Sequence, residues 1–197
     1  MFRKCISLLS AFVLFLSVCQ AAFADSDPSD SVRGHWAEQT LAAWADLGWM
    51  RGDGNGNLRP DDPVTRAEFA ALINRAFGLG TVSGTASFSD LPATDWAYGP
   101  IQTAVDQGYL RGYEDGTARP HRQVTREEAA VMIVRLLGLN IGAAELDFTD
   151  RADIAPWAAG AVAAVSEKGI FRGFPDGTFR PKAHITRAEA AVILERA

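Results

Sequence analysis

Three arginines stand at the same place in a motif that occurs three times in the chain: Arg66, Arg126 and Arg187. Each falls at the first position of an expected helix, where the positive end of the helix dipole disfavours a cation by roughly 0.3–1 kcal/mol. Stability alone favours Asp, Glu or Pro there, so three arginines at this end indicate an anion-binding task. An anion would meet both the guanidinium and the free N–H groups of the first turn. The alternative is structural, with each arginine in a salt bridge to an aspartate of a neighbouring repeat.

The motif itself predicts a helix start. Its threonine is a good N-cap, and the glutamate three positions later can accept from the N–H of the cap, which makes a capping box. The threonines recur at spacings of 60 and 61 residues, so the chain is one unit written three times. We expect a Thr to Ala change to destabilise the fold and an Arg to Ala change at the next position to cost little. The motifs are Val64-Thr65-Arg66-Ala67-Glu68, Val124-Thr125-Arg126-Glu127-Glu128 and Ile185-Thr186-Arg187-Ala188-Glu189.

A tryptophan precedes each motif by 29 residues: Trp36, Trp96 and Trp157. A Trp at the start of a helix is most simply a core anchor. The alternative is a platform for the face of a sugar, with the indole N–H donating to a hydroxyl. Both interpretations hold if the ring lines the floor of a groove.

The second unit shows the organisation of all three. Apolar residues from Trp96 to Gly108 trace one face of a helix, residues 110–120 form a Gly-rich loop, and a second helix runs from Thr125 to a C-cap at Gly138. Two short helices cannot bury their apolar faces alone, so the units must pack on one another. We therefore predict a mostly α protein in which three helix-loop-helix repeats, residues 30–79, 86–139 and 146–197, form one cooperative domain after a leader of residues 25–29.

The N-terminus predicts a secretion signal over residues 1–24. A positive n-region at Arg3 and Lys4 precedes an apolar run and an Ala22-Phe23-Ala24 cleavage site. A lipoprotein site at Cys19 is the rival interpretation. We expect a secreted protein without membrane insertion after cleavage.

Composition excludes several partner classes. The net charge of −5 makes nucleic acid and anionic lipid poor partners, and any bound anion must be recognised by a local cluster. Both cysteines, Cys5 and Cys19, lie in the signal, so no disulfide is expected in the mature chain.

Catalytic and metal-binding motifs are not found in the sequence. The Asp53-Gly54-Asn55-Gly56-Asn57 loop departs from an EF-hand at its sixth and twelfth positions. The histidines occupy three different positions within the repeat, which does not fit a ligand set or a catalytic triad. We expect no cofactor, no metal and no enzymatic activity.

Several motifs resemble the S-layer homology (SLH) domain family. They are the Phe-x-Asp opening of the second and third units, the Trp-Ala pairs, the Gly-Phe-Pro-Asp-Gly-Thr-Phe-Arg-Pro stretch of residues 173–181, and the Thr-Arg-Ala-Glu box. The resemblance covers nearly the whole chain from residue 30. It implies a pseudo-threefold spindle with three prongs and ligand grooves between adjacent repeats.

The family resemblance also implies a ligand and a location. The protein is expected at the cell wall or S-layer, bound to secondary cell-wall polysaccharide that ends in a pyruvylated amino sugar, with the arginine of each box on the acidic sugar. Glu127 replaces Ala in the second box and is expected to weaken that groove. Two alternatives stay open: an S-layer or envelope spacer without sugar binding, and the anchoring module of a larger wall hydrolase. The candidate ligand-binding residues are Arg66, Arg126, Arg187, Trp36, Trp96, Trp157, Gly52, Gly112 and Gly173.

Overall fold

The computed structural model describes residues 28–81, 84, 86–141 and 146–197. Within these ranges the chain forms helices and isolated β-bridges but no strand, which confirms the mostly α class. The predicted signal peptide, with its cleavage site, lies outside the described residues. None of the helices in the described ranges combines the length and apolar character needed to span a membrane. The elements are η1 (Pro28–Val32), α1 (Glu38–Asp46), α2 (Arg66–Ala76), α3 (Tyr98–Asp106), α4 (Arg126–Leu137), η2 (Arg151–Asp153), α5 (Pro156–Glu167) and α6 (Arg187–Glu195).

The three capping boxes form as predicted. At the start of α2, the Thr65 hydroxyl accepts from the backbone N–H of Glu68 at 3.2 Å, and the Glu68 carboxylate accepts from the backbone N–H of Thr65 at 2.8 Å. The same reciprocal pair begins α4 and α6. The predicted C-cap at Gly138 is also confirmed, because this residue ends α4 with a φ of 61° that favours glycine.

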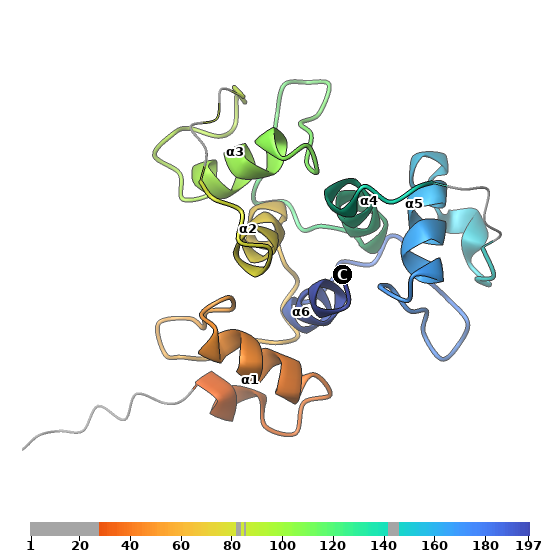
Figure 1. Cartoon of the computed structure of the whole chain (residues 1–197), viewed down its shortest axis with the longest axis horizontal. Coiled ribbons are helices and arrows are strands. Elements are labelled where there is room, and N and C mark those ends of the chain that lie inside the picture. Colours follow the sequence, from red (N-terminus) through yellow and green to blue (C-terminus); the bar gives the residue numbers. More distant parts are fainter. Residues whose placement is uncertain (1–27, 82–83, 85, 142–145) are drawn as a thin grey trace, which may run out of the picture.

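The second helix of each repeat lies at the centre of the molecule and the first helix lies outside it (Figure 1). Each central helix packs on the outer helix of the next repeat, α2 on α3 and α4 on α5. The last central helix, α6, packs on α1, the outer helix of the first repeat. The three repeats therefore close into a ring, and within the described ranges the two helices of one repeat do not pack on each other.

Backbone hydrogen bonds join the repeats around the centre in the same cyclic order. Val64 N–H donates to the Ile185 carbonyl at 3.0 Å, Ile185 N–H to that of Val124 at 3.2 Å, and Val124 N–H to that of Val64 at 3.1 Å. All three side chains are fully buried. At the centre, one residue of each repeat is thus hydrogen-bonded to the equivalent residues of the other two repeats.

One continuous core fills the space between the helices. The apolar stripe predicted for the second repeat contributes Ala129, Met132 and Ile133, which are all buried. Tyr109 is fully buried as well, and its hydroxyl donates to the Asn74 side chain at 2.6 Å across the α2–α3 contact. Burial of this hydroxyl raises the pKa of Tyr109 above its ordinary value.

Candidate ligand-binding grooves

The arginine of each box is buried and bound to the next repeat. Arg126 is only 4% exposed, and its guanidinium donates to the carbonyls of Phe179 at 2.8 Å and Arg172 at 3.1 Å. Because these carbonyls belong to the Gly-rich loop of the third repeat, the side chain holds that loop against α4. Arg66 makes the equivalent pair of bonds to the carbonyls of Ala118 and Arg111, and Arg187 to those of Leu58 and Arg51.

The first-turn N–H groups are not free for an anion, contrary to the sequence-based expectation. At the start of α2, the N–H of Arg66 donates to the Arg122 carbonyl and that of Ala67 to the Pro120 carbonyl, both at 2.9 Å. The next N–H is occupied by the threonine cap. The same three bonds form at the start of α4 and α6. The Arg-Pro turn of the next repeat therefore satisfies the donors that an isolated helix would leave open.

The proposed salt bridge to an aspartate of a neighbouring repeat is also wrong. Among the described residues, only Arg126 of the three box arginines pairs with a carboxylate, and its partner is Glu189 at 3.4 Å. Burial lowers the pKa of Arg126, and the nearby Glu189 carboxylate acts in the opposite direction. The guanidinium groups are thus held mainly by neutral carbonyls.

The three tryptophans lie on the surface, so the core-anchor interpretation is wrong. Trp36, Trp96 and Trp157 are 63%, 55% and 60% exposed. The alanine that follows each of them is buried and takes the place in the core. The helix start therefore turns the indole outward and leaves more than half of each tryptophan exposed.

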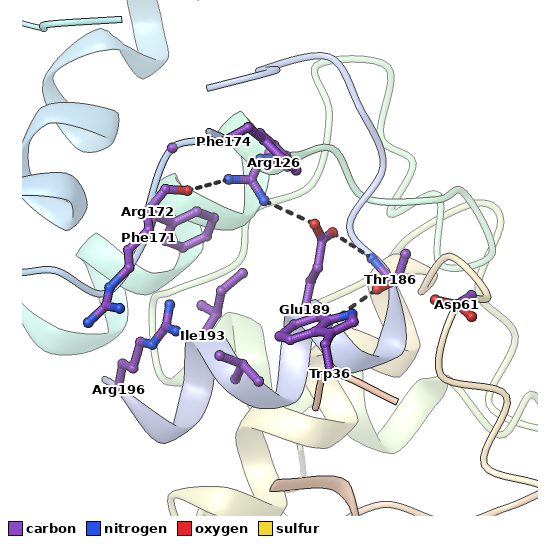
Figure 2. Close-up of a pocket in the computed structure, with 12 residues that line it drawn as sticks. Trp36, Asp61, Arg126, Phe171, Arg172, Phe174, Thr186, Glu189, Ile193 and Arg196 are labelled. Carbon is purple, nitrogen blue, oxygen red and sulfur yellow. Dashed lines mark hydrogen bonds and ion pairs between the residues drawn. The ribbon is translucent and has the colours of Figure 1, made fainter. Parts of the chain in front are cut away.

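Trp36 and Arg126 line a cavity of about 360 Å³, which we call groove A (Figure 2). Its wall is the loop of residues 171–174, and its other side is α6 with its caps, which contributes the N-cap Thr186, Glu189 and the C-cap Arg196. The tryptophan comes from the first repeat, the arginine from the second, and the wall and helix from the third. Groove A therefore exists only when all three repeats are packed together.

A second cavity of about 670 Å³, groove B, is built in the same way. Arg66 comes from the first repeat, the loop of residues 110–115 and Arg135 from the second, and Trp157 from the third. Arg187 and Trp96 have the same places in the repeat as the Arg and Trp of grooves A and B, but they line neither of these two grooves. We call the arrangement around Arg187 and the loop of residues 51–58 position C.

In the loops of grooves A and B, an arginine guanidinium lies over an aromatic ring of the same loop. The Arg180 guanidinium lies 3.8 Å from the centre of the Phe174 ring, and that of Arg119 lies 4.0 Å from the Tyr113 ring. Both arginines have a positive φ, 57° and 48°, which L-residues rarely adopt. The equivalent of Phe174 and Tyr113 at position C is Asp53.

The aspartate of each Phe-x-Asp opening holds this strained turn. Asp90 accepts from the N–H groups of Ala118 and Arg119, both at 2.8 Å, and Asp150 does the same for the third repeat. A second carboxylate, Asp115, accepts from the Arg119 guanidinium at 2.8 Å. Its hydrogen bonds from Thr117 and Arg119 lower the pKa of Asp115 to about 2. In the first repeat the Leu58 N–H donates to the Ser31 hydroxyl instead.

The glycines of the predicted site allow close contact between loop segments. A Cβ on Gly112 would lie 2.3 Å from the Phe88 ring, and one on Gly173 would lie 2.7 Å from the Phe148 ring. At Gly52, the obstacle is the backbone of Gly56 at 2.6 Å. The first repeat has Pro28 in place of the phenylalanine, so the atoms nearest to Gly52 belong to its own loop.

Glu127 does not lie beside the ligand-facing edge of Arg126, contrary to the sequence-based expectation. Its buried carboxylate pairs with Lys182 and accepts from the Ala155 N–H at 3.0 Å. The negative charge therefore faces the contact with the third repeat. The carboxylate that does face Arg126 in groove A is Glu189.

Four arginines that line the grooves were not among the predicted site residues. They form one pair in groove A, Arg172 and Arg196, and one pair in groove B, Arg111 and Arg135. Arg135 and Arg196 recur at the repeat spacing, with Arg75 as their equivalent. That spacing was the available signal, but a basic residue in the last turn of a helix is also what the helix dipole favours. In the ranges that the structure describes, no cluster of metal-ligating side chains occurs.

The family model described as S-layer homology domain matches three segments of the chain, residues 29–70, 87–130 and 147–191. Among curated proteins, an amylopullulanase of Thermoanaerobacterium thermosulfurigenes is 34% identical over 88% of this chain and 10% of its own length. The surface-layer 125 kDa protein of Lysinibacillus sphaericus is 30% identical over 96% of this chain and 16% of its own. A cellulosome-anchoring protein of Acetivibrio thermocellus is 32% identical over 75% of this chain and 35% of its own. The chain thus spans about a third or less of the length of these relatives.

Proposed function

Because the chain belongs to the S-layer homology domain family, we propose that it anchors an exported protein to the bacterial cell wall without a covalent bond. The family is a non-catalytic, wall-binding module, and it indicates a secreted protein associated with the cell wall or the S-layer. The ligand is secondary cell-wall polysaccharide, bound in the grooves between repeats.

One observation carries the proposal: an exposed tryptophan and an arginine-held loop meet in each groove. In groove A, Trp36 is 63% exposed and lines the same cavity as the loop that Arg126 fixes (Figure 2). An indole of this kind can stack on the apolar face of a sugar ring and donate from its N–H to a hydroxyl. The surrounding arginines favour an acidic sugar.

The terminal pyruvylated amino sugar is the ligand that fits this chemistry. Its ketal-linked pyruvate is a carboxylate on an amphipathic ring, so it needs an aromatic surface and a cation at a fixed separation. The proposed site residues of grooves A and B are Arg66, Arg126, Trp36, Trp157, Gly112 and Gly173. We extend the proposal to the third set, Arg187, Trp96 and Gly52, as a weaker position.

Binding to purified wall sacculi tests the proposed function. The protein should sediment with sacculi that retain the secondary polymer and stay in solution after the polymer has been stripped. The double variant Trp36→Ala/Trp157→Ala should no longer sediment with the sacculi. Its thermal unfolding midpoint should equal that of wild type, because both rings are exposed. Equal sedimentation with stripped sacculi would contradict polysaccharide binding and favour a structural spacer that contacts other wall components.

Anchoring is also compatible with an enzymatic cargo. The amylopullulanase and an exoglucanase of Acetivibrio thermocellus, 32% identical over 84% of this chain, are named as enzymes. The proposal for this chain concerns the wall-binding module alone.

A further inference from the structure

Each groove contains two arginines that approach one another from different elements. In groove A, Arg172 follows α5 and Arg196 follows the last turn of α6, and both extend to the same side of the groove in Figure 2. In groove B, Arg111 follows α3 and Arg135 lies in the last turn of α4. All four side chains belong to exposed residues.

The two charges of each pair repel one another. Burial lowers the pKa of Arg196 most, and the charge of Arg172 lowers it further. The pKa of Arg135 is lowered in the same way, first by burial and then by the charge of Arg111. Like charges that line one groove oppose folding rather than favour it. In the part of the chain that the structure describes, no ion pair includes any of these four arginines. The loop arginines beside them are balanced, Arg180 by Asp176 and Arg119 by Asp115.

The box arginine cannot supply a free two-pronged contact to an anion. Its Nε and Nη2 atoms already donate to loop carbonyls, as Arg126 does to Phe179 and Arg172. The remaining Nη1 of Arg126 faces Glu189 at 3.4 Å, so an incoming carboxylate there would meet a negative charge. Among the described residues, the side chains of the paired arginines donate to no carbonyl and form no ion pair, although the Glu195 charge acts on Arg196.

We propose that Arg172 with Arg196 in groove A, and Arg111 with Arg135 in groove B, bind the carboxylate of the acidic sugar. Arg126 and Arg66 are then positioning residues. Arg126 donates to the carbonyl of Arg172 and Arg66 to that of Arg111, so each holds the loop that carries the binding arginine. The inference depends on the proposed function for the ligand, and it assigns the acid-recognising residues of that ligand's sites. The carboxylate removes the repulsion within each pair, since it lies between the two guanidinium groups.

Calorimetric titration with purified secondary polymer, intact or with its pyruvate removed, tests the assignment. The variants are Arg172→Gln/Arg196→Gln, Arg111→Gln/Arg135→Gln, and all four together. Arg33→Gln/Arg151→Gln is the control, because it removes two exposed charges that lie in neither groove. Wild type should bind the intact polymer at least tenfold more tightly than the depyruvylated polymer. Each pair variant should lose one high-affinity site, and the fourfold variant should bind both polymers alike. The control should match wild type.

The thermal midpoint separates a binding role from a structural one. It should stay the same or rise in the pair variants, because repulsion within each pair is removed. A fourfold variant that still prefers the pyruvylated polymer would overturn the assignment. If wild type bound both polymers equally, the carboxylate subsites would be wrong while wall binding stood. If wild type bound neither polymer, the proposed function would fail as well.

Discussion

Trp36 and Arg126 line the same groove although they belong to the first and second repeats, and the rest of its lining comes mostly from the third. The groove is therefore a property of the closed ring rather than of any repeat. The ring depends on bonds such as that from the Arg187 side chain to the Leu58 carbonyl at 2.7 Å, which joins the last repeat to the first. Loss of ring closure should abolish both binding and cooperative folding.

Arg to Ala changes in the boxes should destabilise the protein. Arg187→Ala leaves the carbonyls of Leu58 and Arg51 without their donors in a partly buried loop, which costs about 1–3 kcal/mol. This is the opposite of the effect expected from the helix dipole alone. Urea unfolding followed by circular dichroism measures it, with the exposed Arg33→Ala as the control. A free energy of unfolding unchanged in Arg66→Ala, Arg126→Ala and Arg187→Ala would contradict the role of these side chains as inter-repeat clasps.

Thr to Ala changes at the caps should each lower the free energy of unfolding by about 0.5–2 kcal/mol. Thr125→Ala removes the acceptor for the Glu128 N–H and one side of the capping box. Thr94→Ala, in an exposed turn, is the matched control. The comparison uses chemical unfolding at neutral pH, and an equal midpoint for both variants would argue against the cap.

The local part of the fold was predictable because its causes lie within a few residues. The Thr65–Glu68 box and the Gly138 cap depend on short-range geometry that the sequence displays directly. The contacts between repeats were not predictable in the same way, because the partners of Arg66, Arg126 and Arg187 are backbone carbonyls, which every residue has. Nothing in residue identity marks the Leu58 carbonyl as a partner 129 residues from Arg187.

The tryptophans illustrate the other limit. Their threefold recurrence indicated importance, but recurrence alone does not say which face of a helix start is buried. The adjacent Ala37, Ala97 and Ala158 occupy the core, and they carried the same repeat signal. The acid-binding pairs were missed for a similar reason, since Arg135 and Arg196 have an ordinary explanation in the helix dipole.

Glu127→Gln should not raise the affinity of groove A for the polymer. The carboxylate of Glu127 faces Lys182 and the Ala155 N–H, so its loss should instead lower the free energy of unfolding, by about 1–3 kcal/mol. Calorimetry and urea unfolding on the same sample distinguish the two effects. Tighter polymer binding without loss of stability would restore the expectation that this charge repels the ligand.

Stability should fall as the pH drops below about 4. Hydrogen bonds from Thr117 and Arg119 hold the pKa of Asp115 at about 2 in the folded state, against an ordinary value of 3.8. A carboxylate with a lowered folded pKa contributes stability that is complete above its unfolded pKa and lost as the pH falls through its folded pKa. Hydrogen bonds from Thr178 and Arg180 lower the pKa of Asp176 in the same way. Unfolding midpoints between pH 5 and 2 should have a shallower pH dependence in Asp115→Asn/Asp176→Asn than in wild type, and equal slopes would contradict the linkage.

Trp96→Ala should weaken polymer binding much less than Trp36→Ala or Trp157→Ala. The three rings are similarly exposed, at 55%, 63% and 60%, so the comparison isolates the groove beside each ring. At position C the aromatic ring of the loop is replaced by Asp53, whose pKa is lowered by hydrogen bonds from Asn55 and Asn57 and which therefore remains a carboxylate. In addition, Arg75 already donates to the Trp49 carbonyl at 2.9 Å, unlike its equivalents Arg135 and Arg196.

Titration of wild type with short terminal fragments of the polymer should therefore give two strong sites per chain. Trp36→Ala and Trp157→Ala should each remove one of them, at a cost of about 1.5–3 kcal/mol for the lost burial of the ring. Three equal sites, or an equal loss in Trp96→Ala, would show that position C binds as well as grooves A and B.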